Sequence, residues 1–143
     1  MAGRDINIKN KELDKFLRHL EIKNKVILLD EQKNLLEFYN GIDLLMLTSH
    51  SESFPNVLAE SMLCSTPVLS SNVGCAKEIV NKFGFICNNN NSESIIINLE
   101  KFLNVFNNNK LEWEILKKNS RLQIEKNFSI LKMENSYMQT WAF

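Results

Sequence analysis

The chain lacks the long apolar runs that membrane-spanning helices require. A span needs about 20 consecutive apolar residues, whereas the longest candidates here, 26–29 and 44–48, have only the length of a strand. The first ten residues alternate polar and apolar side chains and contain no continuous apolar region of the kind found in signal peptides. The sequence therefore predicts a cytoplasmic protein.

Neither sign of charge is in excess. The 17 Lys and Arg residues are balanced by 17 Asp and Glu residues, and the two signs are mixed along the whole length. A nucleic acid is bound largely through neutralisation of its phosphates by a basic face or tail, and none is present here. We therefore expect no nucleic-acid partner.

Cysteine is scarce and unpatterned. The three cysteines, Cys64, Cys75 and Cys87, are odd in number, widely spaced and form no C-x-x-C pair. This pattern suggests neither a disulfide framework nor a zinc site. We expect all three to be reduced and mostly buried, and no metal to be bound.

What is present is enough apolar sequence for one domain with a core. The chain has 143 residues, of which 44% are hydrophobic and 24% charged. Between residues 10 and 91, helix-patterned and strand-patterned segments alternate, which is typical of parallel βα units. Helices are predicted at 11–21, 35–39, 55–64 and 75–81, and strands at 26–29, 44–48, 67–70 and 85–87.

From Ser92 onward the pattern is helical only. Helices are predicted at 95–106, 111–126 and 130–141, with Asn-rich loops at 88–91 and 107–109. We therefore divide the chain into an α/β core, 1–91, and C-terminal helices of the same domain, 92–143. A doubly wound parallel sheet usually has five or six strands, so four predicted strands suggest a domain that lacks its first elements.

The segment most informative about chemistry follows the strand 44–48. Its loop lies at the carboxyl end of a buried strand, where open α/β sheets bind ligands. Pro55 suits the first position of a helix, which leaves the amides of Asn56 and Val57 unpaired at the helix start. Such a helix start attracts phosphate and other anions.

Two glutamates flank this helix start. Glu60 lies one turn beyond Asn56 on the same helix face, among apolar neighbours, and a carboxylate there needs a hydrogen-bond donor such as the vicinal hydroxyls of a ribose. Glu52 precedes the helix in the loop. Two glutamates eight residues apart also arise by chance, so solvated surface charges are the alternative interpretation.

The spacing of the two glutamates, taken with the sequence around them, resembles the nucleotide-sugar-binding domain of a family of retaining glycosyltransferases. This is family 4, also called the group 1 transferases, whose members have the GT-B fold. That family's signature is S-x-x-E-G-F-P-x-x-x-x-E-A-M. The matching residues are Ser49, Glu52-Ser53-Phe54-Pro55 and Glu60-Ser61-Met62, and similarity continues through 66–71, 73–74, 78–80 and 84–86. Upstream, 2–5, 26–29 and 43–44 also fit, so the match is close to about residue 90 and loose thereafter.

The resemblance implies roles for these residues. Glu52 would be the catalytic residue that contacts the donor sugar, and Glu60 would hold the ribose hydroxyls. The remaining implied donor-binding residues are His50, Ser53, Phe54, Pro55, Asn56, Val57, Gly74 and Glu78. For His50 an ordinary loop histidine is the alternative, and for Glu78 a helix cap. A UDP-sugar would be the donor substrate, and no cofactor or metal would be needed.

Three residues depart from the family pattern where it favours glycine: Asp30, Ser53 and Ser65. The acceptor-binding N-terminal domain of the family is also absent, so we expect this chain alone to be incomplete for catalysis. In the family the last helix crosses to that domain. Without it, the apolar side chains of 133–141 would be exposed and would favour self-association.

The sequence thus predicts the donor-binding half of a hexosyltransferase that acts in the synthesis of surface polysaccharide, lipopolysaccharide or a lipid-linked glycan. Its partners would be a nucleotide sugar and a glycan or lipid-linked acceptor. The full-length enzyme would be cytoplasmic or peripheral at the inner face of the membrane. The alternatives are a non-catalytic nucleotide-sugar-binding module or subunit that needs a separate acceptor domain and, less favoured, a flavodoxin-like signalling domain.

Overall fold

The computed structural model describes residues 1–89 and 91–141, so Asn90 of the predicted loop 88–91 lies outside the described residues. The chain forms two compact units, Met1–Phe38 and Tyr39–Phe143. This structural boundary differs from the functional division predicted at residue 91, which remains a prediction. Each unit is described by itself.

The first unit contains helix α1 (Lys11–His19) and the beginning of α2 (Leu35–Asn40), which was predicted at 35–39. Helix α1 is capped by Asn10, whose side-chain oxygen accepts a hydrogen bond from the Leu13 amide at 3.0 Å. The helix predicted at 11–21 is thus confirmed, although it ends two residues early. A short 3₁₀ helix, η1 (Lys23–Lys25), follows it.

The strand predicted at 26–29 is wrong. This segment is extended but joins no sheet: the Leu29 amide donates to the Met1 carbonyl at 2.9 Å, and the Asp30 amide donates to the Ile6 carbonyl at 2.7 Å. Ile27 is 72% exposed, so the segment is not covered on both faces. An apolar run becomes a strand only when a neighbouring strand pairs with it, and here irregular N-terminal backbone accepts its hydrogen bonds instead.

The second unit is built on a parallel sheet. Among the described residues the sheet has three strands rather than the four predicted: β1 (Leu45–Leu47), β2 (Val68–Ser71) and β3 (Phe85–Cys87), in the order β1-β2-β3. Leu45 is in register with Val68, and Leu69 with Phe85. The central strand β2 is buried throughout, whereas Met46 of the edge strand β1 is 42% exposed, so β1 is not fully buried as predicted.

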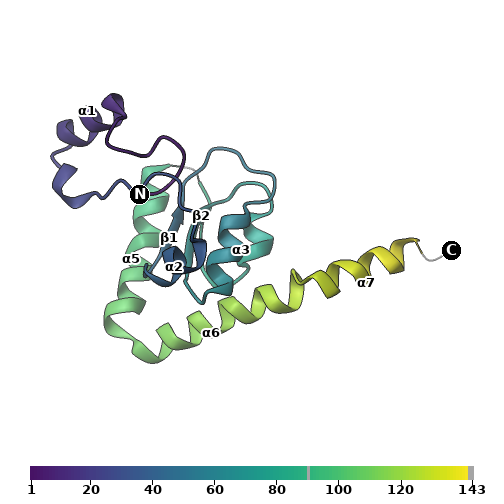
Figure 1. Cartoon of the computed structure of the whole chain (residues 1–143). Helices are drawn as coiled ribbons and strands as arrows, with labels where there is room; N and C mark the ends of the chain where they lie inside the picture. The colour runs from purple at the N-terminus through teal and green to yellow at the C-terminus, as the bar shows by residue number, and fades with distance from the viewer. Residues whose placement is uncertain (90, 142–143) are drawn as a thin grey trace. The chain divides into compact units, whose positions relative to one another are not determined.

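Helices cover both faces of this sheet. Figure 1 shows α3 (Asn56–Leu63) on one side and α5 (Ser92–Asn108) on the other. Helix α6 (Lys110–Asn127) packs against α3, α5 and the short α4 (Ala76–Val80), and α7 (Ile130–Trp141) follows it. The buried core joins α3, β2, α4 and α6 and consists of Leu58, Met62, Val68, Ala76, Ile79, Val80 and Ile124.

The Asn-rich loop predicted at 107–109 is largely helical. Helix α5 runs through Asn108, and Asn109 alone separates it from α6. The Asn109 side chain accepts from the Glu112 amide at 3.1 Å and donates to the Glu112 carboxylate at 2.8 Å. One asparagine that caps a helix start therefore suffices for the turn.

The aromatic residues of the tail divide into two groups. Trp113 packs against Phe102 and Phe106, with ring centroids 5.8 and 5.1 Å away. Tyr137 and Trp141 of α7 are exposed instead, as predicted for an unpartnered last helix. No helix among the described residues is both long and apolar enough to cross a membrane.

All three cysteines are free, as predicted, but they are not mostly buried. Cys87 is buried at the end of β3, whereas Cys64 is half-buried and Cys75 is exposed. Cys64 and Cys75 flank helices α3 and α4, and residues at helix ends lie nearer the surface than a central strand does.

Two of the three departures from the family glycines occur where glycine would relieve strain. Asp30 and Ser65 both have left-handed backbone, with φ of 55° and 59°. Ser53, the third, is not among the residues with positive φ. A side chain at a left-handed position costs on the order of 1 kcal/mol, so the chain bears this cost at Asp30 and at Ser65.

Candidate functional site

The candidate site lies at the carboxyl edge of the parallel sheet. The loop after β1 carries His50, Glu52 and Ser53 and leads into α3, while the loop after β2 carries Gly74 and leads into α4. Because β1 and β2 are parallel neighbours, both loops leave the sheet at the same edge. This is the edge at which open α/β sheets bind ligands.

Gly74 brings the two loops into direct contact. A Cβ atom at this position would lie 2.3 Å from the carbonyl oxygens of both Glu52 and Ser53, and the backbone has φ of +50°. The next amide, that of Cys75, donates a hydrogen bond to the Ser53 carbonyl at 3.1 Å. The absence of a side chain at Gly74 therefore lets the loop after β2 approach the loop that holds Glu52 closely.

The start of α3 presents free amides at this edge. Pro55 is the N-cap residue rather than the first helical residue as predicted, because its ψ of 86° is not helical. Its carbonyl accepts from the Leu58 amide at 3.0 Å. In the described part of the chain the amides of Asn56 and Val57 have no backbone acceptor, so the shift by one residue preserves the predicted pair of donors.

The side chains around this helix start differ in exposure. His50, Ser53, Asn56 and Val57 are exposed, and Glu52 is half-buried. Phe54 is 43% exposed and rests against Phe128 at the end of α6, with ring centroids 5.9 Å apart. Packing of Phe54 on Phe128 therefore joins this loop to the end of α6.

Glu60 already has one hydrogen-bond donor. The hydroxyl of Tyr39, at the C-terminal end of α2 (Leu35–Asn40), donates to Oε2 of Glu60 at 2.8 Å. Tyr39 is only 2% exposed, whereas Glu60 is half-buried. A carboxylate in apolar surroundings needs such a donor, and the protein supplies one without a ligand.

Burial raises the pKa of the Tyr39 hydroxyl well above its ordinary value, and the hydrogen bond to Glu60 raises it further. The folded state therefore holds this proton more tightly than the unfolded chain. The resulting stabilisation is complete below the pKa of an unfolded tyrosine, about 10, and declines as the pH rises through that value.

This shift in the pKa of Tyr39 can be measured by itself, because the chain has two tyrosines and the other, Tyr137, can be replaced. In Tyr137→Phe, Tyr39 is the one that remains, and we expect its tyrosinate absorbance to appear only above the range of an ordinary tyrosine or together with unfolding. Adding Glu60→Gln should lower the titration midpoint but not restore it fully, because burial is the larger cause. Ionisation near pH 10 with an intact circular dichroism spectrum would contradict this assignment.

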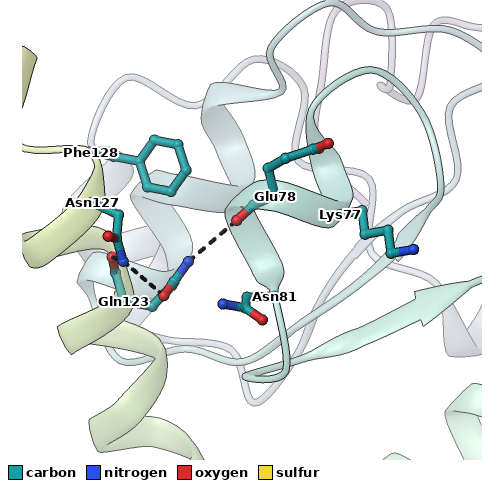
Figure 2. A pocket seen from close by; sticks show the side chains of 6 residues that line it. All are labelled: Lys77, Glu78, Asn81, Gln123, Asn127 and Phe128. Atoms are coloured by element: carbon teal, nitrogen blue, oxygen red, sulfur yellow. Dashed lines mark hydrogen bonds between the residues drawn. The ribbon is translucent and has the colours of Figure 1, made fainter. Parts of the chain in front are cut away.

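Glu78 lies on the short helix α4, which follows the Gly74 loop. Its backbone carbonyl accepts from Gln123 Nε2 at 3.3 Å, and its carboxylate points away from the amides of Gln123 and Asn127 (Figure 2). These residues line a hollow of about 570 Å³ between α4 and α6, together with Lys77, Asn81 and Phe128. The N-terminus of α4 has no side-chain cap hydrogen bond, so the helix-cap alternative for Glu78 has no contact to support it, and its donor-binding role stays a prediction.

The site offers no protein ligands for a metal. Among residues 1–89 and 91–141, no three His, Cys, Asp or Glu side chains come close enough together to hold a metal ion. The donors that the site does offer are backbone amides. That the nucleotide-sugar substrate needs no metal stays a prediction.

Sequence analysis missed two residues that shape the site. Tyr39 contributes to the apolar pattern of α2, and nothing in that pattern indicates a hydroxyl aimed at a residue 21 positions later. Thr66 donates from its hydroxyl to the Tyr39 carbonyl at 2.7 Å. Both contacts depend on tertiary packing and leave no local signal.

Comparison with known proteins gives the chain a family. Residues 2–127 match the family of glycosyl transferases group 1. The chain is 34% identical over 73 residues to N-acetyl-alpha-D-glucosaminyl L-malate synthase of Bacillus anthracis, covering 50% of this chain and 19% of that protein. It is 30% identical over 106 residues to the capsular polysaccharide biosynthesis glycosyltransferase CapM of Staphylococcus aureus, covering 73% of this chain and 27% of that protein.

The fold is that of solved glycosyltransferases. The Anabaena protein HepE, solved in complex with UDP, superimposes with a TM-score of 0.79 at 24% identity, over 99% of this chain and 39% of that one. The chain thus spans about a quarter or less of these two curated relatives and about two fifths of the solved structure. With its parallel sheet and helical tail, the chain belongs to the group 1 glycosyltransferase family and has the Rossmann-like architecture of a GT-B domain.

Proposed function

We propose that the chain is the donor-binding part of a retaining glycosyltransferase and binds a nucleotide sugar at the carboxyl edge of its sheet. The observation that carries this proposal is the contact of Gly74 with the Glu52–Ser53 carbonyls. This contact ties the loop after β2 to the loop that carries Glu52 and leads into the start of α3. Family membership and the UDP complex of HepE support it.

Each group at this edge has a task in the proposed reaction. The amides of Asn56 and Val57 and the positive end of α3 would bind the diphosphate. Fixed donors of this kind stabilise the charge that develops on a departing diphosphate. Glu52 would contact the donor sugar, and Glu60, one turn further along α3, would accept hydrogen bonds from the ribose hydroxyls.

The proposed substrates and pathway rest on the similarity of the chain to the group 1 glycosyltransferases. A UDP-sugar is the proposed donor, and a glycan or lipid-linked acceptor would be bound by a second domain. CapM is named as a capsular polysaccharide biosynthesis glycosyltransferase, which supports a role in surface polysaccharide synthesis. Location in the cytoplasm or at the inner face of the membrane, and self-association through the exposed apolar side chains of α7, remain predictions.

A second candidate is a nucleotide-sugar-binding module without catalysis of its own. The chain spans 27% of the length of CapM, and group transfer requires donor and acceptor to be held together, so nucleotide-sugar binding and transfer are tested separately. Addition of an acceptor-binding domain distinguishes the two. Transfer that depends on Glu52 supports the split enzyme, and binding without transfer supports the module.

Calorimetry of the purified chain with UDP, GDP and UDP-sugars tests the proposed site. We expect one nucleotide class to bind, and Glu60→Gln to weaken it roughly ten- to hundredfold, which corresponds to about 1.5–3 kcal/mol for hydrogen bonds to a charged group. Glu100→Gln, an exposed glutamate on α5, is the matched control and should bind as wild type. Equal binding by Glu60→Gln and wild type would overturn the assignment of Glu60.

A further inference from the structure

Tyr39 stands out as a buried polar residue beside the proposed ribose ligand. It is 2% exposed, and its hydroxyl donates to Oε2 of Glu60 at 2.8 Å. A core position of this kind is usually filled by an apolar residue, and phenylalanine would fill the same space. Packing alone therefore does not account for a tyrosine at this position, and the hydroxyl must act through the hydrogen bond that it donates to Glu60.

A closed set of hydrogen bonds holds Tyr39 in place. The Thr66 hydroxyl donates to the Tyr39 carbonyl at 2.7 Å. The Thr66 amide donates to the Ser61 carbonyl at 3.0 Å, and the Ser61 hydroxyl donates to the Thr66 carbonyl at 3.1 Å. Ser61 follows Glu60 in α3, and Ser61 and Thr66 are both buried. Tyr39 and the backbone that carries Glu60 thus belong to one framework.

This framework restricts the Glu60 carboxylate. A glutamate side chain has three rotatable bonds, and on a helix surface it samples several rotamers. The Tyr39 hydroxyl selects the rotamer in which Oε2 faces it. An ionised carboxylate accepts at about four lone-pair sites, so three remain for a ligand.

We propose that Tyr39 is a positioning residue that orients Glu60 to accept hydrogen bonds from the vicinal hydroxyls of the donor ribose. The proposal rests on the proposed function, because it assigns Glu60 to the ribose. If the Glu60 side chain is already in its bound rotamer before the ligand arrives, binding does not have to immobilise it. The loss of conformational entropy for one side chain is then avoided. Loss of the hydroxyl should therefore weaken binding of a ribonucleotide by roughly three- to tenfold.

The test uses Tyr39→Phe, which removes one oxygen and keeps the ring. Affinities are measured by calorimetry for two probes, UDP and 2′,3′-dideoxyuridine diphosphate. We expect Tyr39→Phe to bind UDP three- to tenfold more weakly than wild type and to bind the dideoxy analogue equally well. Tyr137→Phe makes the same chemical change at an exposed position and should alter neither affinity.

A purely structural role gives a different result. If Tyr39 only supports the fold, its removal weakens both probes alike or neither, and either outcome overturns the proposal. In the Glu60→Gln background, Tyr39→Phe should cause no further loss of UDP affinity, because its effect acts through the Glu60 carboxylate. A further loss of the full size would contradict the proposal.

Two outcomes separate this proposal from the proposed function. If wild type binds UDP and Glu60→Gln weakens it while Tyr39→Phe does not, the positioning role is wrong and the donor site stands. If wild type binds no nucleotide, both are wrong. Should Tyr39→Phe fail to fold, Thr66→Val tests the same framework from its other end, with the same selective loss expected for UDP.

Discussion

Alanine in place of Gly74 is expected to abolish nucleotide binding and to lower the free energy of unfolding by about 3 kcal/mol. Two costs add. The backbone has φ of +50°, which costs a residue with a Cβ atom about 1–2 kcal/mol. The new methyl group would also lie 2.3 Å from the carbonyl oxygens of Glu52 and Ser53, so the loop has to move.

Gly84→Ala is the matched control for this effect. A Cβ at Gly84 would lie 2.7 Å from Val80 Cγ1 and 2.9 Å from the Val68 carbonyl, so it also destabilises the unit, by about 1–3 kcal/mol. Gly84 precedes β3, at the opposite end of that strand from the carboxyl edge, and its variant should bind nucleotide as wild type does while folded. Chemical denaturation and calorimetry on both variants separate stability from binding. Equal losses of binding would show that Gly74 acts through stability alone.

Leu58→Ala is expected to be among the most destabilising single truncations in α3. Leu58 is 0% exposed and lies in the core cluster with Val68, Ile79 and Ile124. Removal of a buried leucine side chain costs about 2–5 kcal/mol, because lost burial and the remaining cavity both contribute. The same core supports the start of α3, so the variant should also bind nucleotide weakly near its melting temperature.

The matched control lies five residues further along the same helix. Leu63 is 40% exposed, so Leu63→Ala makes the same chemical change with much less lost burial and should cost about 1 kcal/mol or less. Urea denaturation followed by circular dichroism gives both values. Similar losses for the two variants would mean that the face of α3 assigned to the core is wrong.

Local sequence patterns predicted most elements of the second unit. The apolar run that became β2, the glycine before β3 and the helical periodicity of α5 each specify local structure that the sheet then uses. The start of α3 was predicted to within one residue, because a proline restricts the backbone on both sides. These signals lie within a few residues of the elements that they specify.

The failures have a common physical origin in partners that are distant in sequence. Residues 26–29 carry the apolar pattern of a strand, but a strand needs a paired neighbour, and their hydrogen bonds go to Met1 and Ile6 instead. The donor for the Glu60 carboxylate was predicted to be a ribose, and the structure adds Tyr39. The motif therefore predicted the candidate site, whereas the buried contact of Glu60 with Tyr39 required the tertiary structure.

The most direct test of the donor site is a map of the amide NMR shifts of the isotope-labelled chain during titration with UDP. The account predicts saturable shifts at Asn56, Val57 and Gly74, with none at the α5–α6 turn around Asn109. Those shifts would place the diphosphate at the start of α3. Shifts confined to the hollow between α4 and α6, or the absence of any shift in the folded chain, would contradict it.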